Sequence, residues 1–294
     1  MLVNLSTSHS ALPNSFAPLR NMSSLDSAWR LAQQWPVDEY SIAVVHKGIT
    51  HTVGDINRRQ RIASVSKPLA AWAFLIAIEE GSMSLDDAVG QTGCTVRHLL
   101  SHAGGYPFKG TQPVAKPETK RIYSNTGFDM LAEHLEHETS MLFSDYLNEA
   151  LFVPLAMNSS ALEGSCAKDI HSTVNDLVLF VDELRSPTLI SRDTWKLAIS
   201  PVFANLAGIV PGIGPSDPCP WGLGVEIKGH KSPHWTATRN SSSTFGHFGG
   251  VGTFLWVDPV ADVACVMCSE RDFNEWGMQY WPAFNDAVLA DLGR

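Results

Sequence analysis

Residues 64–81, SVSKPLAAWAFLIAIEEG, join a Ser-x-x-Lys pair to a long apolar run. A helix brings residues three apart onto one face, so the Ser64 hydroxyl and the Lys67 amine are expected to meet. Pro68 supports a helix start close to Ser64, because proline is tolerated in a first turn, where its missing N–H costs no hydrogen bond. The stretch therefore predicts an apolar helix that begins with a nucleophile beside its base.

The predicted base must lose its proton before it can serve. A serine hydroxyl is a poor nucleophile at neutral pH and needs a positioned base as it attacks a carbonyl. Burial and the positive end of a helix both lower the pKa of a lysine, and we expect this shift at Lys67. The backbone N–H of Ser64 points outward at the helix start and is expected to donate to the oxyanion of acyl transfer.

Two further segments, YSN beginning at Tyr123 and HFG beginning at His247, supply polar groups. Tyr123 is a second candidate for proton transfer, and a nearby cationic lysine would lower its pKa from about 10. In extended backbone Asn125 faces the same side as Tyr123 and offers an amide to the substrate or to Lys67. His247 is expected on an edge-like strand, where the glycines at 249–250 let a substrate approach the backbone.

Similar strings occur elsewhere in the chain. Ser165 and Lys168 form a second Ser-x-x-Lys, and Tyr146 opens a second Tyr-x-Asn. Ser165 lies in a polar stretch with no apolar helix behind it, and Tyr146 lies inside a helical pattern that predicts a packing role. Context therefore favours Ser64 as the nucleophile.

With the three segments in this order and at these separations, the chain resembles the class C β-lactamase and penicillin-binding family of serine hydrolases, which includes family VIII-type esterases. The resemblance extends from about residue 38 to the end of the chain. The strings that carry it beside the three segments are RIASVSKPLAAW, TVRHLLSHAGG, YSNTGFDMLAEHLE, LFVPLAMNSS, WGLGVEI and FGHFGGVGTFLWVDP.

The resemblance implies a role for each matching residue. Ser64 would be the acylated nucleophile and Lys67 its proton acceptor, while Tyr123 would help to protonate the leaving group and to activate water. His247 matches a position that is Lys or His in the family. The implied substrate-binding and oxyanion residues are Asn125, His247, Gly249 and Gly250, with the Gly250 N–H as the second oxyanion donor.

Two departures from the family pattern affect the expected substrate. The middle residue of the third segment is often a Thr whose hydroxyl helps to hold the carboxylate of a β-lactam, whereas this chain has the bulky Phe248. The family's β-lactamases and penicillin-binding enzymes are normally exported, whereas the N-terminus of this chain has neither a basic start nor an apolar stretch before a cleavage site. Both departures favour esterase-like or peptidase-like members, and the second one predicts a cytoplasmic protein.

The order of helical and β-like patterns predicts an α+β fold. A helix near 24–34 and strands in YSIAVVHKG and ITHTVGD, with a turn at Lys47–Gly48, precede a mostly helical middle. β-like runs at 223–227, 243–248, 252–258 and 263–269 and a closing helix at 281–292 follow. The economical packing is one antiparallel β-sheet flanked by the N- and C-terminal helices, with an inserted helical region, as in the β-lactamase/transpeptidase-like fold. We expect a discontinuous sheet domain of residues 1–75 and 206–294 and a helical region of residues 76–205.

Composition narrows the class of protein. The chain has 294 residues, 44% of them hydrophobic, and a formal net charge of −9, which leaves no basic surface for nucleic acid. Its longest apolar run, residues 69–78, is shorter than the roughly 20 residues that span a bilayer. We therefore expect a small-molecule substrate, no nucleic-acid partner and no membrane span, and the sequence does not predict an oligomeric state.

The cysteines and histidines are read as structural. Five cysteines are an odd number, and Cys265 and Cys268 lie in a run that alternates like a buried strand. His98 and His102 are four apart on a predicted helix but lack an evident third ligand, so packing and capping are favoured over a metal site. A further pair, at 230 and 234, is expected at the surface. We expect no metal and no organic cofactor.

Two features near the motifs have alternative interpretations. The loop at 104–121 is either a lid over a cleft or a solvated connector. Trp221 and Trp235 either line an acyl pocket or belong to the core.

The sequence thus predicts a serine hydrolase that acts on an ester, amide or lactam through an acyl-enzyme on Ser64. The favoured subclass is a β-lactamase-like hydrolase with esterase activity. A true β-lactamase, a D-amino-acid peptidase and a non-catalytic ligand-binding protein on the same fold remain alternatives.

Overall fold

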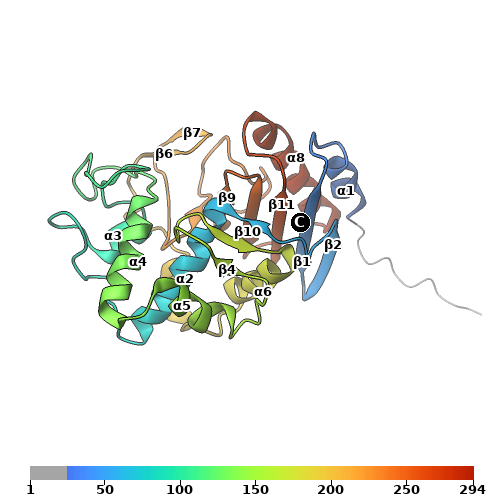
Figure 1. Cartoon of the computed structure of the whole chain (residues 1–294). Helices are drawn as coiled ribbons and strands as arrows, with labels where there is room; N and C mark the ends of the chain where they lie inside the picture. Colours follow the sequence, from blue (N-terminus) through green and yellow to red (C-terminus); the bar gives the residue numbers. More distant parts are fainter. Residues whose placement is uncertain (1–24) are drawn as a thin grey trace, which may run out of the picture.

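A six-stranded antiparallel sheet, in the order β2-β1-β11-β10-β9-β8, runs through the molecule (Figure 1). It is seen in a computed structural model that describes residues 25–294. The N-terminal residues on which the expectation about export rests lie outside the described part. The strands are β1 Tyr40–His46, β2 Ile49–Val53, β8 Glu226–Ile227, β9 Phe245–Gly249, β10 Thr253–Asp258 and β11 Val263–Ser269.

Both faces of this sheet are covered. Ile42 and Val44 of β1 pack in one buried cluster with residues of α1 (Asp26–Ala32) and α8 (Glu275–Asp291). Ala43 and Val45 alternate with them and pack in a second cluster with residues of α6 (Val174–Arg185). Helices from the two ends of the chain therefore lie side by side on one face, with α6 across the other (Figure 1).

The middle of the chain is mostly helical, as predicted. One helix there, α2 (Ser66–Glu79), is buried from Ser66 to Ala77, which explains why its sequence is apolar on every side. The other elements are the 3₁₀ turn η1 Ala63–Val65, α3 Val96–Leu100, α4 Thr126–Thr139, α5 Phe143–Leu147, the π-helical turn η2 Asn148–Phe152, α7 Arg192–Ala198, and the short strands β3 Gln60–Arg61, β4 Ala161–Leu162, β5 Ile170–Ser172, β6 Gly208–Val210 and β7 Gly214–Ser216. The predicted fold class is confirmed.

Element bounds differ from the sequence pattern most at two places. The closing helix begins at Glu275 rather than Trp281, because the Asn274 side chain caps it by accepting from Trp276 N and Pro282 is accommodated inside it. The helical pattern at 130–151 is interrupted at Ser140, whose φ of 57° ends α4.

Among residues 25–294, no helix combines the length and the apolar character that a membrane crossing requires.

Candidate active site

Ser64 and Lys67 lie at the start of α2. Ser64 belongs to the 3₁₀ turn η1 and is partly exposed, whereas Lys67 is fully buried in the first turn of the helix. The Lys67 Nζ donates to Asn125 Oδ1 at 2.6 Å and to the carbonyl of Ala167 at 2.9 Å. The predicted helix start and the contact between Asn125 and the lysine are thus observed. Asn125 itself has helical backbone rather than the extended backbone that we expected.

Burial lowers the pKa of Lys67 from 10.5 to about 7. The ammonium form loses hydration in this position, and its two hydrogen-bond acceptors offset that loss only in part. The Nζ also lies 4.5 Å from the centroid of the Tyr123 ring. A substantial fraction of Lys67 is therefore an uncharged amine near neutral pH, as a proton acceptor must be.

Tyr123 connects the first segment to the third. Its hydroxyl lies 3.3 Å from His247 Nε2. Burial raises the pKa of Tyr123 well above 10 and outweighs the lowering effect of the Ser64 side chain. The expectation of a lowered tyrosine pKa is wrong, because desolvation dominates and the neighbouring Lys67 is itself only partly charged.

His247 is a neutral imidazole. Its Nδ1 lies 2.6 Å from the carbonyl of Phe248 and donates to it, so Nε2 is left as an acceptor that faces the Tyr123 hydroxyl. Burial lowers the pKa of His247 to about 3. His247, at a position where a lysine would be charged, thus carries no charge in this chain.

The two glycines at 249 and 250 differ in the space around them. A Cβ on Gly249 would lie 2.5 Å from the carbonyl of Ile62 and 2.3 Å from Thr253 Oγ1, so glycine is required for β9 to approach η1. A Cβ on Gly250 would meet nothing within 4 Å. Strand β8 pairs with β9 only at 245–246, so the backbone after this point has the edge-like character that the sequence predicted.

A cavity of about 180 Å³ is lined by residues of all three sequence segments, among them Ser64, Tyr123 and His247. It is smaller than pockets for drug-sized ligands, which span about 300–1,000 Å³. Phe108 of the 104–121 loop stacks on Tyr123 at its mouth, as a cleft-bordering loop would, and Trp221 forms part of the wall. Trp235 packs behind Phe248 instead. The lining residues are Ser64, Phe108, Tyr123, Val210, Pro211, Gly212, Trp221, Glu226, His247, Phe248, Gly250 and Phe273.

Glu226, a buried carboxylate in the cavity wall, is not among the site residues predicted from the sequence. Its Oε1 lies 3.0 Å from Lys231 Nζ and 3.3 Å from His234 Nε2, and its Oε2 accepts from Trp235 Nε1 at 2.7 Å. The expected surface position of His234 is therefore wrong, because its ring is buried against this carboxylate. A charged residue inside the apolar β-like run LGVEI was the signal that could have identified the cluster.

The second copies of the motifs form no comparable site. Ser165 donates to Asp129 Oδ1 at 2.5 Å, while Lys168 pairs with Asp169. The Tyr146 hydroxyl donates to Glu80 at 2.6 Å and its ring is buried, which confirms the packing role.

The histidines at 98 and 102 also have the structural roles that the sequence favoured. His98 Nδ1 accepts from Thr95 N and caps α3, and the ring of His102 packs 4.6 Å from that of Tyr123. Within residues 25–294, no group of three or more potential ligands could hold a metal ion. The five cysteines are buried and free, and Cys265 and Cys268 face opposite clusters from β11.

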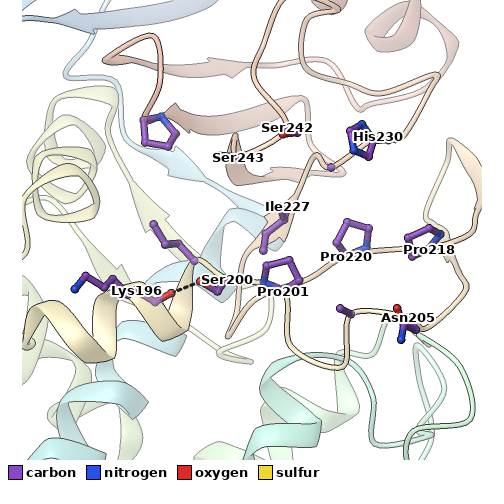
Figure 2. A pocket seen from close by; sticks show the side chains of 14 residues that line it. Lys196, Ser200, Pro201, Asn205, Pro218, Pro220, Ile227, His230, Ser242 and Ser243 are labelled. Carbon is purple, nitrogen blue, oxygen red and sulfur yellow. Dashed lines mark hydrogen bonds between the residues drawn. The ribbon is translucent and has the colours of Figure 1, made fainter.

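A larger hollow of about 620 Å³ lies elsewhere, between α7 and the segments around Pro220 and Ser242 (Figure 2). Lys196 and Ser200 are its most reactive pair by residue type, but Ser200 Oγ donates to the carbonyl of Lys196 and the Lys196 amine faces Asp193. None of the residues of the three sequence segments lines it. The smaller cavity beside Ser64 is therefore the candidate active site.

Comparison with known proteins identifies the family. A family model described as Beta-lactamase matches residues 31–290. The crystal structure of a beta-lactamase from Mycobacterium bovis is similar, with 43% identity and a TM-score of 0.89 over 90% of this chain and 99% of that chain.

Two further matches are more distant. EstCE1, a hydrolase with promiscuous acyltransferase activity, shares the fold at a TM-score of 0.73 over 90% of this chain and 97% of its own, with 16% identity. Penicillin-binding protein 4* of Bacillus subtilis is 26% identical over 132 residues. That match covers 34% of this chain and only 29% of the length of that curated relative.

Proposed function

Because the chain belongs to the β-lactamase family, we propose that it is a serine hydrolase that forms an acyl-enzyme on Ser64. One observation carries the proposal: a fully buried Lys67 with a pKa of about 7 lies one helical turn from Ser64 and beside Tyr123, at a cavity that both Ser64 and Tyr123 line. A base poised near the working pH is what general-base activation of a hydroxyl requires.

In acylation, the neutral Lys67 amine takes the hydroxyl proton of Ser64 as the Ser64 Oγ bonds to the substrate carbonyl carbon. The backbone N–H groups of Ser64 and Gly250 are the proposed donors to the resulting oxyanion. The tetrahedral intermediate then collapses, and the leaving group departs with a proton that passes from Lys67 through the Tyr123 hydroxyl. His247 Nε2 and Asn125 hold these two proton carriers in position.

Deacylation uses the same groups with water as the nucleophile. Water gives a proton to the amine as it attacks the acyl carbon, and the released Ser64 oxygen takes the proton back. Each step conserves charge between the lysine, the tyrosine and the reacting oxygens. The proton transfers of this cycle use the side chains of Ser64, Lys67 and Tyr123 together with water.

An ester is the favoured substrate. The cavity is small and Phe248 occupies its wall, which suits a compact acyl group better than a bulky lactam. Hydrolysis of a β-lactam is a second candidate, because the M. bovis structure that is 43% identical is that of a beta-lactamase. Action on a D-amino-acid peptide, ligand binding without turnover and a cytoplasmic location stay predictions.

The decisive experiment is intact-mass analysis after mixing the protein with a fluorophosphonate. We expect one adduct on the wild type and on Ser165→Ala, and none on Ser64→Ala. Ser165 is the matched control because it belongs to the other Ser-x-x-Lys. Labelling that survives in Ser64→Ala, or its absence from the folded wild type, contradicts the proposal.

A time course with a penicillin then separates the two substrates. A transient adduct with accumulating product supports β-lactam hydrolysis, and a lasting adduct indicates penicillin binding with blocked deacylation. No adduct, together with turnover of a simple ester, supports the esterase.

A further inference from the structure

The ion pair behind the catalytic cavity has a definite orientation. Glu226 lines the cavity, whereas its partner Lys231 lines a separate hollow behind it. The two side chains are 1% and 2% exposed, and their charged atoms are 3.0 Å apart. The negative end of a desolvated dipole therefore faces the space that a substrate enters.

The surrounding contacts keep Glu226 ionised. Trp235 Nε1 donates to it, and His234 Nε2 donates as well, because Thr236 N already donates to His234 Nδ1. These groups and Lys231 hold the pKa of Glu226 well below 4.5, although burial opposes this shift. Lys231 itself also donates to the carbonyls of Pro220 and Ile227, so it is anchored away from the cavity.

Lys231 balances the charge of Glu226 from behind, but within residues 25–294 no cation in the cavity wall faces the substrate beside this carboxylate. Among the described residues that line the cavity, none is a lysine or an arginine. His247 is neutral because its pKa is about 3, and Lys67 does not line the cavity and is only partly charged near neutral pH. A substrate carboxylate would thus lose its hydration beside a like charge, with no cation to receive it.

We propose that Glu226 is a specificity-determining residue that makes this cavity select uncharged substrates over those that carry a carboxylate. The proposal rests on the proposed serine hydrolase activity and narrows its substrate class to neutral esters. It also argues against β-lactams and peptide C-termini, whose carboxylates would have to enter the cavity. Like charges brought together in a poorly hydrated site discriminate between ligands by repulsion.

The test compares two acetyl esters of nearly equal shape, 4-acetoxybenzamide and 4-acetoxybenzoate, by their kcat/KM values. We expect the wild type to prefer the uncharged amide by about tenfold. The double change Glu226→Gln with Lys231→Met removes the ion pair as a unit and should narrow this preference about fivefold. Glu149→Gln, which removes one exposed carboxylate and so changes the net charge by the same step as Glu226→Gln, should leave the ratio as in the wild type.

The outcomes separate the two proposals. Failure of the wild type to hydrolyse either ester, with no labelling by a fluorophosphonate, overturns the serine hydrolase itself. Turnover of both esters with equal kcat/KM, or a preference that the double variant retains, overturns the role of Glu226 alone. If the double variant does not fold, Glu226→Gln replaces it, because the amide oxygen can still accept from Trp235. If that variant also fails to fold, the test is the wild type's own ratio of kcat/KM values for the two esters. Equal values overturn the role of Glu226.

Discussion

At the residue scale, the proposed chemistry depends on one lysine that is too deeply buried to hold its proton firmly. Lys67 loses its hydration at the start of α2, and the amide of Asn125 and one carbonyl replace it only in part. The same burial that makes the amine a base also destabilises the fold below the lysine's ordinary pKa. Two predictions follow from this coupling, one on rate and one on stability.

The first prediction concerns the pH dependence of ester hydrolysis. Because the uncharged form of Lys67 is the proposed acceptor of the Ser64 proton, kcat/KM should rise with pH through a midpoint near 7. His247, with a pKa of about 3, does not titrate in this range. Initial rates between pH 5.5 and 8.5 give the profile by experiment, at fixed ionic strength. A flat profile would show that Lys67 is not the base.

The second prediction concerns stability. Between pH 7 and 10.5 the unfolded chain binds a proton at Lys67 that the folded chain does not, so raising the pH favours the folded state at this site. The free energy of unfolding of the wild type relative to Lys67→Met should therefore rise by about 1.4 kcal/mol per pH unit. Urea unfolding of both proteins at about pH 8 and 9 measures it. A constant difference would contradict the lowered pKa.

At this scale, the contacts that the sequence could predict are those between residues close together in the chain. Ser64 and Lys67 are neighbours on one helix, and their contact needs only a period of 3.6 residues. The raised pKa of Tyr123 arises where segments far apart in the chain, such as that of His247, bury its ring. His234 is buried by a loop that folds back onto Glu226, and local patterns describe neither arrangement. The roles assigned to the individual site residues stay predictions.

At the element scale, the site depends on how closely β9 approaches η1. Thr253 of the adjacent strand β10 donates from its hydroxyl to the carbonyl of Ile62, directly before η1. Gly249 lies against both of these groups, where a side chain has no room. The oxyanion donors proposed at Ser64 and Gly250 come from these two elements, so their spacing decides whether the donors converge.

The third prediction uses the two adjacent glycines as a matched pair. Gly249→Ala should lower the free energy of unfolding by about 1–3 kcal/mol, because its Cβ meets backbone and a buried hydroxyl. Gly250→Ala should change it by less than about 0.5 kcal/mol, since its Cβ enters open space. Urea unfolding at pH 7.5 compares the two variants. Equal losses of stability would mean that the close approach is not what selects glycine at 249.

Elements were predictable where local signals agree. The β1–β2 hairpin follows from two β-like runs on either side of Lys47 and Gly48, and these two turn residues have positive φ. The early start of α8 was not predictable, because Pro282 suggests that a helix begins near it. The cap by the Asn274 side chain is seen only in the structure. Pairing of the first strand with the last, β1 with β11, came from packing economy rather than from any local signal.

At the scale of the whole molecule, Arg121 connects the segments that enclose the cavity. Its buried guanidinium donates to four backbone carbonyls, those of Ser101, Val202, Phe203 and Cys219. Arg121 lies two residues before Tyr123, and Cys219 lies two residues before Trp221. The Arg121 side chain therefore connects the segment that carries the tyrosine to the segment that carries Trp221 of the cavity wall. The division into a sheet domain and a helical region remains a prediction, and this residue belongs to the region where the two would meet.

The fourth prediction is that Arg121→Met lowers the free energy of unfolding by about 3 kcal/mol or more, because it leaves buried carbonyls without donors. Arg61→Met is the control, since Arg61 forms an exposed ion pair with Asp169, and its loss should cost less than about 1 kcal/mol. Urea unfolding measures both. In the folded fraction of Arg121→Met, ester kcat/KM should also fall, because Tyr123 and Trp221 lose their common anchor. Full activity and stability in this variant would mean that the cavity wall is held by aromatic packing alone.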